Sequence, residues 1–278
     1  MTRFLRPRLV IGTLLVVTVL LVAIFAPLVS PFDPAHQDLQ ATLVPAAWQH
    51  GGRLAHLFGT DMLGRDVLSR LIYGARPAML VAVTAAAGAA LVGSLLALAA
   101  GYLGGWVDGV IGCALDVWMS VPPVILALIV MAGLGAGLFN VVLAIVLGDW
   151  ARLCRVLRAE VQAVAHRDHV AAARLLGFSH LRTALLDVLP AILPLLAVLF
   201  TFEMGIAVVV EAVLSFVGFG VGAGQIAWGQ MIADGRLAVF EAPWNLLAPV
   251  IAIFAVAAGC NLVGDGLRRA FGRGRPCA

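Results

Sequence analysis

Apolar residues gather in long runs, separated by shorter polar segments, along most of the chain. A bilayer core of about 30 Å is crossed by about 20 apolar residues in a helix, so each run of that length predicts a membrane span. Six such runs cover about residues 9–29, 78–100, 113–134, 139–157, 191–213 and 246–263. The pattern therefore predicts an all-α, polytopic membrane protein with six transmembrane helices.

The first run resembles a secretory signal in one respect, because arginines at positions 3, 6 and 8 precede it. Its apolar stretch from Leu9 to Val29 is longer than the core of about 7 to 15 residues that such signals carry. We therefore expect residues 1–30 to form a cytoplasmic tail and a retained first membrane helix.

The fourth run changes character at its end instead of stopping. Leu153, Leu157 and Val161 recur at helical spacing while charged residues occupy other faces, and this pattern is typical of an amphipathic helix. The fourth span is thus expected to continue beyond the apolar run until the polar residues "HRDH" at 166–169.

A short helix is predicted next, from about Asp168 to Leu176. Gly177 suits the left-handed residue that ends a helix, and Ser179 suits the N-cap of the helix that follows. Pro190 is expected in the first turn of the fifth span, where its missing N–H is tolerated. The segment is therefore predicted to fold as helix, tight turn and helix.

Composition agrees with a membrane protein and excludes some chemistry. Hydrophobic residues make up 62% of the 278 residues and charged residues 12%. All 18 basic residues are arginine, so a Walker A phosphate loop and a Schiff-base lysine are both excluded. Cys113, Cys154, Cys260 and Cys277 lack paired spacing, which favours buried apolar cysteines over a disulfide framework or a zinc site.

The distribution of arginine predicts the orientation. Thirteen of the 18 arginines fall in the N-terminal tail, in the segment 152–182 and in the C-terminal tail, and the other five lie at 53, 65, 70, 76 and 236. With six spans the two sets lie on opposite sides of the membrane. Because positive loops stay cytoplasmic, we expect both termini and the segment 152–189 in the cytoplasm.

Small residues recur at every fourth position along the second span, at Ala89, Gly93, Ala97 and Gly101. Such a ridge lets another helix approach closely. Alanine and glycine are also common throughout this chain, so close helix contact and mere composition are both open at this point.

Acidic side chains inside the predicted spans are candidate pore or subunit-interface residues, because a charge at the bilayer centre costs about 2.5 to 3.5 kcal/mol on insertion scales. They are Asp116, Asp149, Glu203 and Glu211. Glu203 lies nearest the middle of its span and is expected to face a pore, a partner subunit or an arginine. Asp116 and Asp149 are expected to reach interfacial water, and Glu211 lies near the outer end of its span.

Asp61 and Asp66 form the one acidic pair that suggests a metal site, but no third ligand is spaced nearby. We expect Asp61 to cap an amphipathic helix on the membrane surface, with Arg65 and Asp66 on its wet face. The six histidines show no metalloprotease spacing. Neither a metal site nor a catalytic constellation is predicted, and an integral-membrane enzyme is disfavoured.

The stretch "AAARLLGFSHLRTALLDVLP" at 171–190 resembles the EAA loop of ABC importer permeases, in which Glu-Ala-Ala is followed by a glycine and then by Leu-Pro. Ala172 and Ala173 match the alanines, Gly177 the glycine, and Leu189 with Pro190 the final pair. Ala171 stands where the pattern has glutamate, so that carboxylate is absent. The resemblance implies an ATPase-docking coupling helix whose residues are Arg167, Asp168, His169, Ala171, Ala172, Ala173, Arg174 and Gly177.

Other stretches resemble one branch of that family, the C-type subunits of dipeptide, oligopeptide and nickel permeases. They are "FGTDMLGRDVLSRLIYGARP" at 58–77, "VEAVLSFVGFGV" at 210–221, "WGQMIADGR" at 228–236 and "NLVGDGLRRAF" at 261–271. The C-terminus departs from the branch by ending in "GRGRP". The resemblance implies a type-1 ABC importer transmembrane domain for di- or oligopeptides, with nickel or another small solute as the alternative.

The resemblance also implies the partners and the division of the chain. Residues 31–76 would be an extracytoplasmic segment with the amphipathic helix, 77–265 the permease core with its coupling loop at 166–190, and 266–278 a cytoplasmic tail. The partners would be a homologous permease subunit, two cytoplasmic ATPase subunits that bind ATP and Mg, an extracytoplasmic substrate-binding protein and membrane lipid. No cofactor is expected in this chain, no nucleic acid is implied, and the location would be the bacterial inner membrane.

A proton-coupled secondary transporter is the rival class, because the acids inside the spans could form a proton relay. Such transporters carry inverted repeats and paired broken helices. Neither is evident in the sequence, and six spans with an EAA-type loop fit half of a permease better.

Overall fold

The computed structural model describes residues 6–222 and 224–271, and no strand occurs among them. The predicted all-α fold is therefore confirmed for this part of the chain, whereas Arg3, Arg273, Arg275 and Cys277 lie outside it. The α-helices are α1 (Arg6–Ile24), α2 (Ala26–Val29), α3 (Val67–Leu98), α4 (Gly105–Met119), α5 (Pro123–Leu134), α6 (Leu138–Ala165), α7 (Asp168–Leu175), α8 (His180–Thr183), α9 (Leu189–Phe216), α10 (Trp228–Gly235) and α11 (Trp244–Phe271). Single turns of other helix types, η1 (Ala99–Leu103), η2 (Ala184–Val188) and η3 (Arg236–Ala238), extend α3, α8 and α10.

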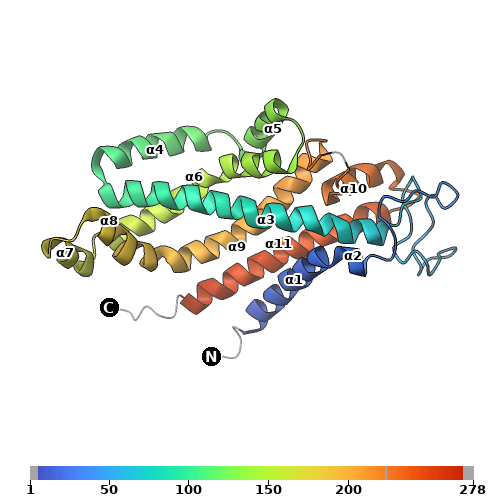
Figure 1. The fold of residues 1–278 in the computed structure, drawn as a ribbon, viewed down its shortest axis with the longest axis horizontal. Helices are drawn as coiled ribbons and strands as arrows, with labels where there is room; N and C mark the ends of the chain where they lie inside the picture. Colours follow the sequence, from blue (N-terminus) through green and yellow to red (C-terminus); the bar gives the residue numbers. More distant parts are fainter. Residues whose placement is uncertain (1–5, 223, 272–278) are drawn as a thin grey trace.

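Five long helices, α1, α3, α6, α9 and α11, run along the long axis of the molecule (Figure 1). Helix α3 packs against both α6 and α9, α11 packs against α9, and α1 packs against the outer side of α11. The shorter helices lie at the ends and along one side of this bundle, so the bundle fixes where each end of the molecule lies.

Helix α3 begins at an N-cap that the sequence analysis placed on the wrong aspartate. The Asp66 carboxylate accepts a hydrogen bond from the Ser69 backbone N–H at 2.8 Å, which makes Asp66 the cap. From Val67 the helix continues without a break through Pro77 to Leu98. The expected separate surface helix is therefore the first part of α3, and its residue Val67 is buried.

The ridge of small residues on α3 contacts α6. Ala89 and Ala97 are fully buried, and a Cβ atom on Gly93 would lie 3.0 Å from both the Leu153 Cβ and the Trp150 carbonyl oxygen. A side chain at position 93 would crowd the α6 backbone, so glycine lets the two helices approach closely. Close helix contact, one of the two interpretations left open by the sequence, is confirmed.

The sequence predicts six membrane spans, but fewer helices of the described chain are both long enough and apolar enough to cross a membrane. Four helical segments of the described chain satisfy both criteria, Pro7–Ile24, Val67–Leu103, His180–Phe216 and Trp244–Phe271, and a fifth span results if α4 and α5 are counted as one. Helix α6 has 28 residues but carries Asp149, Arg152 and Arg155 along its length. It is long enough to span and too charged to qualify on composition.

The predicted third span at 113–134 is broken. Helices α4 and α5 meet at an angle of 83°, with Ser120, Val121 and Pro122 between them. Proline at 122 and 123 explains the break, because a residue that precedes proline is pushed out of the helical conformation. The apolar run continues through this point, so its hydrophobicity alone concealed the bend.

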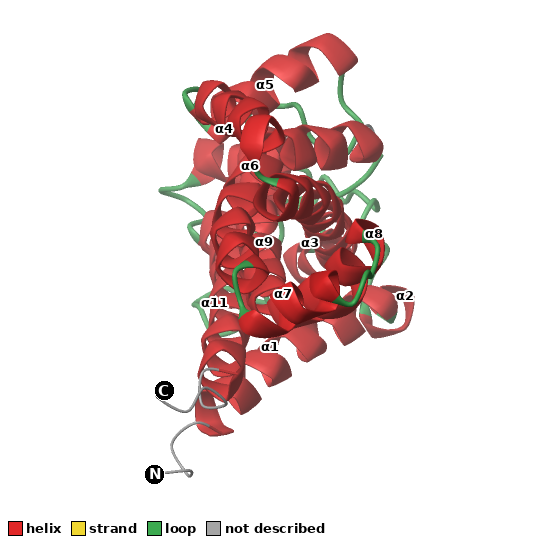
Figure 2. Cartoon of the chain, turned by 90° about the vertical axis from the view of Figure 1, so that its left-hand side faces the viewer, coloured by secondary structure: helices red, strands yellow, loops and turns green. Residues whose placement is uncertain are grey.

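The two ends of the bundle differ in what they contain. The start of α1, the end of α11 and the pair α7 and α8 lie at one end, and the irregular segment 30–66 with α10 lies at the other (Figure 1). Figure 2 views the first end directly and places α7 in front of the bundle. We refer to these as the α7 end and the α10 end.

Candidate functional site

Helix α7 is attached to the bundle along one side. Its Val170 is fully buried and packs in a cluster with Val161 and Val164 of α6, Val188 of η2 and Ile192 of α9. Since each of these residues is apolar, burying them stabilises α7 against the two long helices that enter and leave the loop. A displacement of α7 would therefore be carried directly to α6 and α9.

The end of α7 follows the sequence prediction closely. Gly177 has φ +81°, a left-handed conformation that side chains rarely adopt. The Phe178 N–H donates to the Ala173 carbonyl at 3.2 Å, and the Gly177 N–H donates to that of Arg174 at 3.0 Å, as in a glycine-terminated helix. Ser179 then caps α8 by accepting from the Arg182 N–H. The predicted terminator and N-cap are both confirmed.

Pro190 lies in the first turn of α9, as predicted, although the helical segment that could span the membrane begins earlier, at His180. Helix α9 begins at Leu189 with Pro190 in its first turn. The preceding η2 turn and α8 continue into α9 without an intervening loop. The Leu-Pro pair thus lies at the start of α9 but within a continuous helical segment, His180–Phe216, that begins soon after α7.

The outward side of α7 combines small residues with large apolar ones. Ala171 and Ala172 are exposed, whereas Ala173 is buried. Leu175 is 90% exposed and Leu176 75% exposed. The sequence analysis identified the alanines and missed the leucines, although both stand in the quoted stretch next to Gly177. The exposed side of α7 therefore presents two alanines and two leucines to its surroundings.

The charged candidates around α7 fall into two groups. Arg167, Asp168 and His169 are exposed at its start. Arg174, in contrast, lies over the Tyr102 ring at 4.6 Å and its Nε donates to the Tyr102 hydroxyl at 3.4 Å. Arg174 therefore attaches α7 to η1 instead of extending outward, and Tyr102 is a residue of this site that the sequence analysis missed.

A charge cluster with two buried carboxylates and one half-exposed arginine connects α6 with α9. Glu203 is 1% exposed, and its Oε2 accepts a hydrogen bond from the Arg152 Nη2 at 2.5 Å. The same Arg152 atom lies 3.3 Å from the Asp149 Oδ1. The expectation that Glu203 meets an arginine is confirmed, while Asp149, expected at interfacial water, is buried with it.

The two other acidic candidates lie apart from this cluster. Glu211 is buried further along α9, where its Oε1 accepts from the Ser215 hydroxyl at 2.6 Å. Asp116 is exposed on α4 and pairs with Arg155 at 2.5 Å. Arg158, three residues after Arg155 on α6, forms two hydrogen bonds with Asp108, which lies eight residues before Asp116 on α4 and was not selected from the sequence. Ion pairs thus join α4 to α6.

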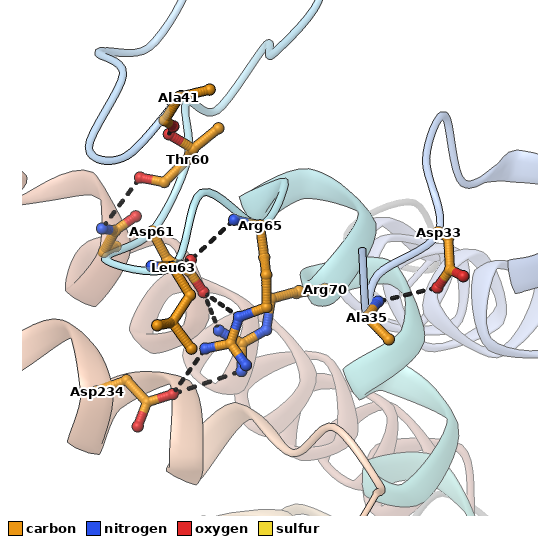
Figure 3. Close-up of polar contacts among 10 residues, drawn as sticks. Asp33, Ala35, Ala41, Thr60, Asp61, Leu63, Arg65, Arg70 and Asp234 are labelled. Carbon is orange, nitrogen blue, oxygen red and sulfur yellow. Dashed lines mark hydrogen bonds and ion pairs between the residues drawn. The ribbon is translucent and has the colours of Figure 1, made fainter. Parts of the chain in front are cut away.

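Figure 3 shows a second charge cluster, at the α10 end. Asp61 accepts from the backbone N–H groups of Leu63 and Arg65 at 2.9 Å, from the Arg65 Nε at 2.7 Å and from the Arg70 Nη1. Asp234 of α10 lies 3.5 Å from both guanidinium groups. The sequence analysis considered Asp61 as a cap or metal ligand, and the structure surrounds it with hydrogen-bond donors.

The described residues contain no cluster of side chains suited to a metal ion. Within residues 6–222 and 224–271, no three histidine, cysteine, aspartate or glutamate side chains are placed to hold a metal ion. His56 instead contacts Asp66 at 3.0 Å. The described residues therefore give no support to the metal interpretation of the Asp61 and Asp66 pair.

Comparison with protein families gives two matches. Residues 89–275 match the model of the binding-protein-dependent transport system inner membrane component, and residues 1–46 match the N-terminal TM domain of oligopeptide transport permease C. The first match covers α7 and the helices α6 and α9 on either side of it. The second covers α1 and the start of the irregular segment 30–66.

Similar proteins of known name cover nearly the whole chain. The dipeptide transport system permease protein DppC of Escherichia coli is 39% identical over 94% of this chain and 87% of its own length. The di/tripeptide transport system permease protein DppC of Pseudomonas aeruginosa is 37% identical over 93% of this chain and 86% of its own length. A probable D,D-dipeptide transport system permease protein of Escherichia coli is 35% identical over 94% of this chain and 86% of its own length.

Proposed function

The chain belongs to the family of binding-protein-dependent transport system inner membrane components, and from that premise we propose that it carries di- or oligopeptides across the membrane. It is a permease subunit of an ABC importer, a component that relies on the ATPase subunits of its complex to bind ATP. The peptide substrate is proposed because three similar permeases, 35% to 39% identical, are named for dipeptides or tripeptides.

We further propose that α7 is the coupling helix that docks into an ATPase subunit. This proposal rests on an exposed apolar surface of α7, formed by Ala171, Ala172, Leu175 and Leu176. The surface is flat where it is formed by the two alanines. Arg167, Asp168 and His169 border the surface. Gly177 ends the helix, so that only about two turns enter the partner.

The proposed mechanism is a rigid transfer of movement. When ATP closes the ATPase subunits, α7 moves with the groove that holds it, and the buried Val170 contacts transmit this movement to α6 and α9. These two helices also carry Glu203 and Asp149, which we assign with Glu211 and Asp116 to the translocation pathway or the interface with the second permease. Movement at the α7 end would thereby open or close the pathway.

The complete importer is proposed to contain one further homologous permease, two ATPase subunits and an extracytoplasmic substrate-binding protein. The α7 end would then be cytoplasmic, with both termini, and the α10 end extracytoplasmic. The distribution of arginine supports this orientation. Residues 77–265 would be the permease core. Residues 1–30 would be the N-terminal tail with the first helix, 31–76 the outer segment, and 266–278 the C-terminal tail.

An Ala172→Trp variant tests the coupling role. Ala172 is exposed and so can be enlarged without disturbing the fold of this chain, but an indole would prevent α7 from entering a groove that fits alanine. We expect ATP-driven uptake of dialanine by proteoliposomes containing the full complex to fall at least about a hundredfold, the effect of roughly 3 kcal/mol of overpacking.

Ala270→Trp is the matched control, since Ala270 is exposed near the end of α11 at the same end of the molecule. It should leave uptake unchanged. Normal uptake by the Ala172→Trp complex would reject the docking role. Uptake that continues without ATP, driven by a proton gradient, would instead favour a secondary transporter.

A further inference from the structure

A cavity of about 370 Å³ opens at the α10 end, between the segment that precedes α3, helix α10 and the start of α11. Its volume is in the range of about 300 to 1,000 Å³ that small-molecule sites occupy. The polar and charged side chains that line it are Asp61, Arg65, Arg70, Gln230, Asp234 and Asn245. Both signs of charge are therefore present on its wall.

Asp61 and Arg70 form the fixed part of this wall. Both residues are buried, and Asp61 is held by two backbone N–H groups as well as by the guanidinium groups of Arg65 and Arg70. A buried carboxylate with this many donors has little capacity for another ligand. Its role is to orient the two arginines.

Asp234 forms the loose part of the wall. Its side chain is 42% exposed, and its Oδ2 lies 3.5 Å from the Nη2 atoms of both Arg65 and Arg70. Charge-assisted hydrogen bonds in proteins are normally about 2.7 to 2.9 Å long, so neither contact uses the full donor capacity of the arginines. The guanidinium groups of Arg65 and Arg70, drawn in Figure 3 with Asp61 and Asp234, can therefore donate hydrogen bonds to a further carboxylate.

Among the residues that the structure describes, two buried polar atoms of side chains that line this cavity lack a hydrogen-bond partner. They are the Nε donor of Arg70 and the Oδ1 acceptor of Asn245, and each residue is 4% exposed. Buried polar groups are nearly always paired, and an exception requires an explanation. A ligand that brings an acceptor and a donor together would satisfy both atoms.

We propose that this cavity binds the two charged ends of a zwitterionic peptide as it enters the permease. The peptide carboxylate contacts Arg65 and the free Nε of Arg70, and the peptide ammonium contacts Asp234 and the free Oδ1 of Asn245. The proposal rests on the proposed peptide-import function and adds a recognition site within the permease itself.

Binding of dialanine to the full permease and ATPase complex in nanodiscs, without the binding protein, tests this site by calorimetry. Dialanine amide lacks the carboxylate and N-acetyldialanine lacks the ammonium. Each modification should weaken binding to the unmodified complex about tenfold, because each removes charge-assisted hydrogen bonds.

The variants Arg65→Gln and Asp234→Asn separate recognition from structure. Arg65→Gln should weaken dialanine binding about tenfold and leave the already weakened binding of dialanine amide unchanged. Asp234→Asn should weaken dialanine binding about tenfold and leave the already weakened binding of N-acetyldialanine unchanged. Arg53→Gln is the matched control, since Arg53 is exposed in the same outer segment and does not line the cavity.

Three outcomes would overturn the proposal. They are an absence of dialanine binding, equal affinity of the unmodified complex for all three probes, or variants that weaken all three probes alike, which would indicate a structural link between α10 and α3. If a variant does not assemble, the affinities of the unmodified complex for the three probes still test the proposal. Failure of the proposed function is measured separately, as absent ATP-driven dialanine uptake with the binding protein present.

Discussion

Glu203 illustrates how a single carboxylate is accommodated inside an apolar helix. Its partner Arg152 lies on another helix, 51 positions away in sequence. The sequence predicts that Glu203 needs a counter-charge, because an unpaired charge in the bilayer is unfavourable. It cannot identify Arg152, since that pairing depends on how α6 and α9 pack.

A double-mutant cycle measures this pair. Arg152→Ala leaves Asp149 and Glu203 buried without their cation, whereas Glu203→Ala leaves Arg152 its contact with Asp149. We expect Arg152→Ala to destabilise the protein more. The double variant should be less destabilised than the sum of the singles by about 1 kcal/mol or more, within the usual range for residues in contact. Reversible unfolding in detergent provides the measurement, and additive effects would show that the pair contributes no coupling.

At the scale of elements, the sequence predicted best those features that are encoded locally. The end of α7 at Gly177 and the cap at Ser179 depend only on neighbouring backbone groups, and both are confirmed. The orientation of Arg174 toward Tyr102 joins positions 72 residues apart, so no local pattern could predict it. The break before α5 did have a local signal, the two prolines, which the apolar run concealed.

The contact of α3 with α6 gives the element-scale prediction. A Gly93→Leu variant places a side chain where a Cβ atom alone would already be 3.0 Å from the α6 backbone. We expect a loss of about 1 to 3 kcal/mol in the free energy of unfolding, the usual effect of overpacking. Gly109→Leu on α4 is the control, because no atom lies within 4 Å of its Cβ position. A smaller loss at Gly93 than at Gly109 would contradict the packing of α3 on α6.

At the scale of the whole molecule, the bundle separates the proposed docking surface of α7 from the cavity near α10. The two lie at opposite ends, joined by α3, α6, α9 and α11 (Figure 1). Counting arginines predicted which segments share a side, because charge asymmetry requires no knowledge of packing. The number of six spans came instead from the apolar runs, and helix length and apolarity give four or five because α6 carries Asp149, Arg152 and Arg155.

Single-cysteine labelling tests the orientation. In a background without the four native cysteines, we expect Leu54→Cys to react in intact cells with a maleimide that cannot cross the inner membrane. Ala270→Cys should react only after that membrane is opened. Both positions are exposed and lie at opposite ends. The reverse pattern would invert the proposed topology.

If α7 docks into an ATPase as proposed, its exposed leucines would also affect how the cell handles an unassembled subunit. A copy that has not met its ATPase presents Leu175 and Leu176 to water, and unpaired apolar surface of that kind is what chaperones and quality-control proteases recognise. Surplus copies would be removed while assembled copies are protected. The same two side chains that make α7 suitable for docking would thus keep subunit stoichiometry balanced through selective proteolysis.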